Sequence, residues 1–118
     1  MKHNLKIGAQ GEIIAQNFLT RNNFKILDKN FRVGKLAEID IIATKNHKLH
    51  FIEVKARTNK KFGWPEEAVS DLKLEKINQA ALAYLEKNNL RQNWQIDIIS
   101  ILLNQSERVA TLWFFPGV

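Results

Sequence analysis

The chain has 118 residues, of which 45% are hydrophobic and 25% charged, and it contains no cysteine. Its length predicts a single domain, residues 1–118, large enough to bury a core. The absence of cysteine excludes disulfide frameworks and thiolate metal sites. No apolar run approaches the roughly 20 residues that span a bilayer, and the first residues lack the apolar centre of a signal peptide. We therefore expect a cytoplasmic protein with no membrane partner.

The charge balance is basic, since 18 Lys and Arg against 12 Asp and Glu give a formal net charge of +6. Such a balance favours polyanionic partners, because each phosphate that is neutralised by a cationic side chain releases counterions. Many basic proteins bind no nucleic acid, however, so charge alone leaves nucleic-acid binding open.

Hydrophobic periodicity predicts the first elements of the chain. Apolar residues at helical spacing predict an amphipathic helix over residues 4–22, and a mixed apolar and polar stretch predicts a strand over residues 24–31. The two strongest strand signals, rich in Ile, Val and Phe, cover residues 36–44 and 48–57. A loop is expected over residues 58–65.

The second half of the chain predicts a further helix and two more strands. Ser70 is a favourable N-cap, Asp71 lies in the first turn where the helix dipole favours negative charge, and Asn88-Asn89 marks the end. Residues 94–103 and 108–115 are typical of strands. The order helix, three strands, helix, two strands predicts an α/β fold, a mixed central sheet flanked by helices.

Two acidic residues on the strongest strands, Asp40 and Glu53, are thirteen positions apart. Side chains alternate along a strand, so Glu53 and Lys55 share one face of theirs. If Asn46-His47 forms a two-residue hairpin turn, Asp40 lies opposite Glu53, with Cβ atoms ~4.5–5.5 Å apart. Two like charges there repel by roughly 3 kcal/mol at an effective dielectric constant of about 20. Asn-His is a weaker turn signal than Asn-Gly, which leaves the register open by one or two residues.

A divalent cation would turn that repulsion into attraction. Mg²⁺ prefers one or two carboxylates together with water and phosphate oxygens, so Asp40 and Glu53 predict a site for Mg²⁺ (or Mn²⁺). Such an ion would polarise a phosphate and acidify a water nucleophile, while Lys55 would orient that water or meet the phosphate charge. The competing interpretation is a solvated sheet face, on which Glu38 forms a salt bridge with Lys55.

The two segments resemble the PD-(D/E)xK phosphodiesterase superfamily, which has the restriction-endonuclease-like fold. Its signature is an acid at the end of one strand and Asp/Glu-x-Lys on the next, matched by Asp40 and by Glu53-Val54-Lys55. More narrowly, the whole chain resembles the YraN-like family of small bacterial proteins. The motifs that carry this narrower resemblance are Gly8-Ala9-Gln10-Gly11-Glu12, Glu38-Ile39-Asp40-Ile41-Ile42, Phe51-Ile52-Glu53-Val54-Lys55-Ala56-Arg57 and Phe62-Gly63.

The resemblance implies a restriction-endonuclease-like core and a metal-dependent nuclease that acts on DNA, including branched or otherwise structured DNA. It makes Asp40 and Glu53 the principal metal ligands, Lys55 the catalytic lysine and the Val54 carbonyl a candidate further ligand. Glu12 corresponds to the helix-borne acid that archaeal Holliday-junction resolvases place beside the metal. Junction-cutting relatives are dimers, which leaves a homodimer open by analogy.

Two positions depart from the family pattern. Ala37 stands where the family usually has Gly, and Gln95-Ile96-Asp97 stands where it usually has Arg-Phe-Asp, which puts a role for that arginine in doubt. For Glu12, the residues themselves leave two readings. Gly8 and Gly11 allow a close helix approach that would bring Glu12 towards the strands, and a surface glutamate is equally compatible.

The loop after the second strong strand carries basic residues interleaved with aromatics: Arg57, Lys60, Lys61, Phe62 and Trp64. This pattern predicts contacts with phosphates and stacking on bases. The alternative is a solvated loop whose aromatic rings pack back onto the domain. Lys73, at the start of the second helix, is a further candidate for nucleic-acid binding, and it is also compatible with a merely solvated position.

Three functional hypotheses follow from these observations. The first is a metal-dependent endonuclease with nucleic acid, in particular DNA, as its partner. The second is a non-catalytic nucleic-acid-binding or adaptor protein that retains the fold, and the third is a structural subunit that acts through Trp113-Phe114-Phe115. Metal binding separates the first hypothesis from the other two.

Overall fold

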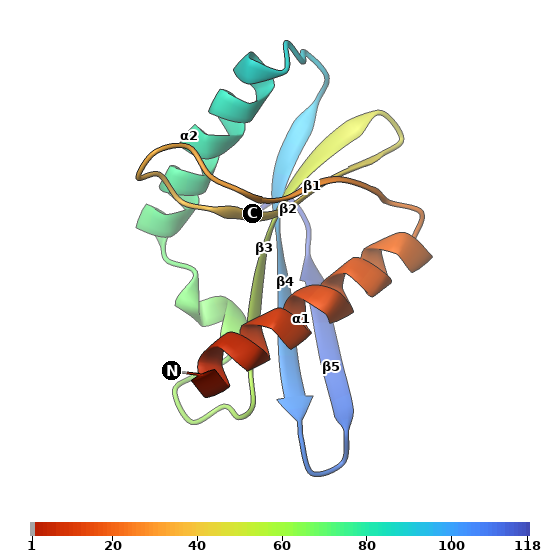
Figure 1. The fold of residues 1–118 in the computed structure, drawn as a ribbon, viewed down its shortest axis with the longest axis vertical. Coiled ribbons are helices and arrows are strands. Elements are labelled where there is room, and N and C mark those ends of the chain that lie inside the picture. The colour runs from red at the N-terminus through yellow and green to blue at the C-terminus, as the bar shows by residue number, and fades with distance from the viewer. Residues whose placement is uncertain (1) are drawn as a thin grey trace.

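Two long helices, one 3₁₀ helix and five strands make up the computed structural model, which describes the backbone of residues 2–118 and the side chains from residue 6 onward. In chain order the elements are α1 (Lys2–Arg21), β1 (Lys25–Phe31), β2 (Ile39–Lys45), β3 (Lys48–Arg57), η1 (Pro65–Ala68), α2 (Asp71–Lys87), β4 (Trp94–Asn104) and β5 (Val109–Phe115). The predicted α/β class and element order are confirmed (Figure 1). The 3₁₀ helix η1 is an addition to the predicted loop.

The five strands form one mixed sheet in the order β1-β2-β3-β4-β5. Only β3 and β4 run parallel, and the other three neighbouring pairs are antiparallel. Parallel neighbours need a crossover connection, which η1 and α2 supply between β3 and β4. The N-cap predicted for α2 is present, because the Ser70 hydroxyl accepts a hydrogen bond of 3.1 Å from the Lys73 N–H.

The β2–β3 hairpin turns at the predicted two residues. Asn46 and His47 have φ angles of +52° and +65°, and two successive positive φ angles are what a type I′ turn requires. The resulting register pairs Ile42 with Phe51, as the two-residue turn predicts. Continued towards the start of β2, this register places Asp40 opposite Glu53.

A helix covers each face of the sheet, and α1 crosses in front of the strands in Figure 1. On the α1 side, buried residues from the helix pack against one face of the central strands, among them Leu19, Ile41 and Ile52. On the α2 side, Ile77 and Tyr84 pack with Phe51. The predicted acidic pair lies on this second face, so part of the predicted charged face is buried under α2.

The predicted start of the second strand, at Leu36, is wrong, because the strand begins at Ile39. A turn precedes it, in which the Leu36 N–H donates to the Val33 carbonyl (2.9 Å). Glu38 therefore lies outside the strand, and its carboxylate pairs with Arg32 at 2.8 Å. The salt bridge between Glu38 and Lys55 that the solvated-face interpretation expects is replaced by this local pair.

Helix α1 approaches β3 closely at Gly11. A Cβ atom on Gly11 would lie 2.7 Å from the Cβ of Ala56, closer than real Cβ contacts, so only glycine fits without a shift. This contact brings the next residue, Glu12, to the region where β3 extends past the start of β2. Within residues 2–118, neither helix is long and apolar enough to span a membrane.

Candidate metal site

A pocket of about 370 Å³ opens where β3 runs beyond the start of β2. Four residues of the predicted catalytic set line it together with one residue of α2: Glu12, Asp40, Glu53, Lys55 and Lys73. The pocket thus collects side chains from α1, β2, β3 and α2. The structure brings the predicted catalytic and metal-binding residues to one place, whereas their roles remain predictions.

Asp40 and Glu53 form the floor of this pocket, in which Glu53 is buried and Asp40 is half-buried. The Asp40 Oδ2 atom accepts a hydrogen bond of 2.8 Å from the Val54 N–H, which fixes the carboxyl group at the edge of β3. The Glu53 residue is only 3% exposed, and its Oε2 atom is buried without a hydrogen-bond donor among the described residues. Its one cationic neighbour is the Lys73 ammonium group at 3.4 Å, which forms no hydrogen bond with it, so a bound cation would replace hydration that this buried oxygen has lost.

The surroundings of Asp40 disfavour its charged form. Burial raises the pKa of Asp40 to about 9, helped by a carboxyl–carboxyl hydrogen bond with Glu53 and by the charge of Glu53. The Val54 N–H opposes this rise, since a hydrogen bond to the carboxylate favours the charged form. The surroundings of Asp40 therefore favour its neutral form in the absence of a cation.

Glu12 adds negative charge from the helix side. Partial burial raises the pKa of Glu12 first, and the charges of Glu38 and Glu53 raise it further, while Lys29 lowers it. With its amide nitrogen turned towards the acids, Asn30 donates to Glu38 (2.8 Å) and to Glu12 (3.2 Å). The close-packing interpretation of Glu12 agrees with this placement, and the surface-glutamate interpretation does not.

Two lysines face the acids from different elements. The Lys73 Nζ atom at the start of α2 lies 3.4 Å from Glu53 Oε2, so an ammonium group offsets part of the buried negative charge. Lys55 is half-buried, lies two residues beyond Glu53 on the same face, and lines the pocket. Among the described residues, Lys55 forms no ion pair, which leaves its ammonium group available to a ligand.

The donor set suits a hard cation with few protein ligands. Among residues 6–118, no group of three or more His, Asp or Glu side chains is arranged to hold a metal ion. The Asp40–Glu53 pair supplies two carboxylates, which is the number that Mg²⁺ commonly takes before water and phosphate oxygens complete its shell. The pair therefore fits Mg²⁺ or Mn²⁺, while ligation by Glu12 and by the Val54 carbonyl stays a prediction.

Residues 58–64 are here called the basic loop. Its predicted nucleic-acid-binding residues lie outside this pocket. The Trp64 ring packs edge-on against the Trp113 ring of β5, with centroids 5.4 Å apart, as the alternative of aromatics packing back expected. Phe62 does not pack back, since it is 80% exposed. Arg57, at the end of β3, donates to the Phe62 carbonyl at 3.3 Å and so supports the loop.

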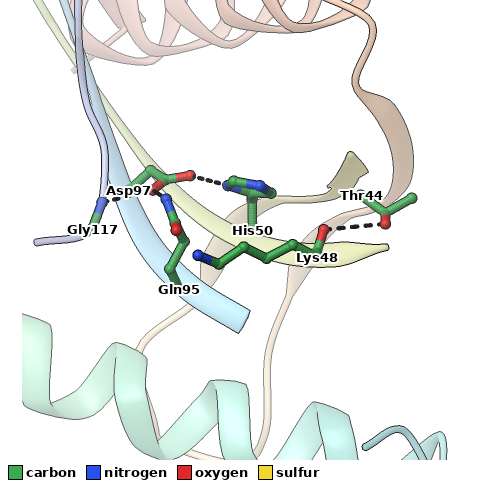
Figure 2. Close-up of polar contacts among 6 residues, drawn as sticks. All are labelled: Thr44, Lys48, His50, Gln95, Asp97 and Gly117. Atoms are coloured by element: carbon green, nitrogen blue, oxygen red, sulfur yellow. Dashed lines mark hydrogen bonds and ion pairs between the residues drawn. The ribbon is translucent and has the colours of Figure 1, made fainter. Parts of the chain in front are cut away.

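A second buried polar cluster was not predicted from the sequence (Figure 2). The fully buried Asp97 carboxylate contacts His50 Nδ1 at 2.6 Å and accepts hydrogen bonds from Gln95 Nε2 (2.6 Å) and the Gly117 N–H (2.9 Å). One signal was available: Asp97 interrupts an otherwise apolar strand, and a buried charge needs partners. This cluster connects β3 and β4 to the C-terminal segment.

Residues 11–101 match the uncharacterised protein family UPF0102. This range contains every residue that lines the pocket except Gly8. A UPF0102 protein of Clostridium novyi is 44% identical over 103 residues, 86% of this chain and 85% of the relative. One of Clostridioides difficile is 44% identical over 102 residues, covering 86% and 89%. One of Dictyoglomus turgidum is 38% identical over 116 residues, 98% of each chain.

Proposed function

Since this chain belongs to the YraN-like, uncharacterised protein family UPF0102, its activity has to be inferred from the site, and we propose that it is a metal-dependent nuclease. The proposed reaction is hydrolysis of phosphodiester bonds in DNA, including branched or otherwise structured DNA. The observation that carries the proposal is the pair of half-buried Asp40 and buried Glu53, whose Oε2 atom accepts no hydrogen bond among the described residues, with Lys55 lining the same pocket.

Burying two acids opposite each other is unfavourable for a protein that only needs to fold. Like charges placed opposite on neighbouring strands are destabilising, and the cost rises when water is excluded. A structural role would be met by apolar or amide side chains of similar size. The arrangement is useful where a cation binds during function, because its charge turns the repulsion into attraction.

Each polar group of the pocket has a task in the proposed reaction. Asp40 and Glu53 would hold the ion, and Val54 keeps the Asp40 carboxyl in position through its N–H. When bound, Mg²⁺ supplies charge stabilisation at the phosphate and acidifies water. Lys55 would orient the attacking water or stabilise the charge that develops on the phosphate.

A cleavage assay with matched variants tests the proposal. We expect wild-type protein with Mg²⁺ or Mn²⁺ to cut at least one of linear, flapped or four-way DNA. Asp40→Ala and Lys55→Ala should lower the rate by a factor of about 100 or more, the usual scale for an electrostatic group at a reacting centre. If there is no substrate that the wild-type protein cuts faster than these variants do, the nuclease proposal is wrong.

One observation favours a second candidate, a non-catalytic nucleic-acid-binding or adaptor protein. The Lys73 ammonium group lies 3.4 Å from Glu53, where it could permanently replace a metal ion as the positive charge beside the acids. Calorimetric titration of Mg²⁺ separates the two candidates. A nuclease requires heat of binding that Glu53→Ala abolishes, whereas the adaptor requires salt-sensitive DNA binding that persists without metal and in Asp40→Ala.

A further inference from the structure

The basic loop is held in one conformation by contacts at several points. The Trp64 N–H donates to Glu67 Oε1 (3.1 Å), and the Arg57 side chain donates to the Phe62 carbonyl. The edge-on contact between Trp64 and Trp113 ties the loop to β5. The loop is therefore ordered by the domain itself, before any ligand binds.

The two acids that follow the loop are used internally. Glu66 Oε1 accepts a hydrogen bond of 2.7 Å from Ser100 Oγ, which is completely buried on β4. The Glu67 carboxylate lies against Gly63, where a Cβ atom would come within 2.9 Å of its Oε2, and the φ angle of Gly63 is +97°. With both carboxylates turned to these partners, the outward surface of the loop is cationic and aromatic.

The outward surface of the loop combines an exposed aromatic ring with ammonium groups. Phe62 presents a ring that is 80% exposed, and the Lys61 Nζ atom lies 5.8 Å from its centroid. The exposed Lys60 places its Nζ atom 4.5 Å above the Trp64 ring. Exposed aromatic faces alternating with ammonium groups suit the stacking of bases and the pairing of phosphates.

We propose that the basic loop binds an unpaired nucleic-acid strand, with a base stacked on Phe62 and phosphates paired to Lys60 and Lys61. A duplex would not satisfy Phe62, because its bases present their faces to each other and only edges and backbone to a protein. The inference rests on the proposed function, because the bound strand would be part of the nuclease substrate. It predicts that substrates of the site carry a single-stranded segment, as a flap, an overhang or an open junction.

Binding can be measured without hydrolysis. Fluorescence anisotropy with labelled oligothymidylate and oligouridylate, in buffer with a chelator, reports the Kd of each strand and a blunt duplex serves as competitor. Phe62→Ala should weaken binding roughly tenfold, since base–aromatic stacking contributes about 1–3 kcal/mol per base, and Phe62→Trp should restore it. Ile13→Ala, which removes another exposed apolar side chain from α1, should leave the Kd unchanged.

The lysines are tested through the salt dependence of the same Kd. Lys60→Gln and Lys61→Gln should each reduce the slope of log K against log salt by about 0.7, the value for one phosphate contact on a single strand. Lys25→Gln, an exposed lysine on β1, should not change the slope. The ratio of the Kd for oligothymidylate to the Kd for oligouridylate shows whether the loop prefers a DNA or an RNA strand.

The inference is overturned if Phe62→Ala binds like wild type, if Ile13→Ala loses as much affinity, or if blunt duplex competes as well as the single strand. A surface built for a protein partner would give the first of these outcomes. This inference and the nuclease proposal can fail independently. If Phe62→Ala cleaves at the wild-type rate, only the role of the basic loop is wrong. If binding depends on Phe62 but no substrate is cleaved, only the nuclease proposal is wrong.

Discussion

The pKa of Asp40 is raised by its partial burial and by the second acid, Glu53, beside it. Its pKa is raised from 3.8 in the unfolded chain to about 9 in the folded protein. Between these values the folded state binds more protons than the unfolded state, so stability falls as pH rises. The direction is opposite to that of an ordinary salt-bridged aspartate.

We therefore predict that the metal-free protein loses stability between about pH 4 and pH 9 through Asp40, by at most about 1.4 kcal/mol per pH unit. Asp40→Asn keeps the size of the side chain but cannot titrate, so its stability should depend less on pH. Urea unfolding at several pH values in the presence of a chelator measures both slopes. Parallel slopes for wild type and Asp40→Asn would show that Asp40 does not hold the proton.

Lys73 acts as the counter-ion of Glu53 in the metal-free protein. A cation that binds Glu53 has to compete with this ammonium group at 3.4 Å. Lys73→Met keeps the aliphatic length of the side chain and removes the charge, so we predict a several-fold lower Kd for Mg²⁺ or Mn²⁺. The variant should also be less stable without metal.

The control for this prediction is Lys76→Met, which changes an exposed lysine on the same helix. Calorimetry gives the Kd, and thermal unfolding with and without metal gives the stability. A Kd in Lys73→Met that equals or exceeds that of Lys76→Met would mean that Lys73 does not compete with the cation, and that its place next to Glu53 has another reason.

At the scale of elements, the packing of α1 on β3 decides where Glu12 lies. Gly8 and Gly11 are both helical glycines, but only Gly11 lies at close range to another element, where the Cβ of Ala56 on β3 leaves no room for a side chain. At Gly8 an added Cβ would meet nothing within 4 Å. The two positions therefore separate the intrinsic cost of glycine in a helix from its steric use.

We predict opposite effects for the same substitution. Gly8→Ala should raise the free energy of unfolding by up to about 1 kcal/mol, because alanine is the better helix former. Gly11→Ala gains the same propensity but forces α1 away from Ala56, and a shift of this kind costs typically 1–3 kcal/mol. Denaturant unfolding measures both. Equal stabilisation by the two variants would contradict the close approach at Gly11.

At the scale of the whole molecule, Asp97 joins segments that are distant in the chain. Its carboxylate contacts His50 on β3 and the Gly117 N–H near the C-terminus (Figure 2), and the Val118 N–H donates to the Ile96 carbonyl alongside. The ring of Phe24, between α1 and β1, packs edge-on against the His50 ring with centroids 4.9 Å apart and closes the cluster. The charge is buried, but it is fully partnered.

Removal of this carboxylate should be costly. We predict that Asp97→Ala lowers the free energy of unfolding by about 3–5 kcal/mol, because His50 and the Gly117 N–H lose their buried partner. Amide hydrogen exchange of the C-terminal segment should increase as well. Glu86→Ala, an exposed acid on α2, provides the comparison and should change stability by less than about 0.5 kcal/mol. A small effect of Asp97→Ala would mean that the cluster is dispensable.

Much of this fold could be predicted from local patterns. Alternation of side chains predicted that Glu53 and Lys55 share a face, and the Asn46-His47 turn predicted the register of β2 with β3. Both depend on neighbours in the chain, so the sequence alone determines them. The start of β2 was missed because the Glu38–Arg32 pair and the turn before Ile39 involve partners outside the strand pattern.

Which of these residues meet depends on how the elements pack on one another. The close approach at Gly11 brings Glu12 to the acids, and the crossover through α2 brings Lys73 to Glu53. Neither contact has a local signal, since each joins elements whose relative position depends on packing across the sheet. Local patterns are enough to place two acids on neighbouring strands. Packing across the sheet then buries Glu53, raises the pKa of Asp40 and brings Lys73 to within 3.4 Å of Glu53.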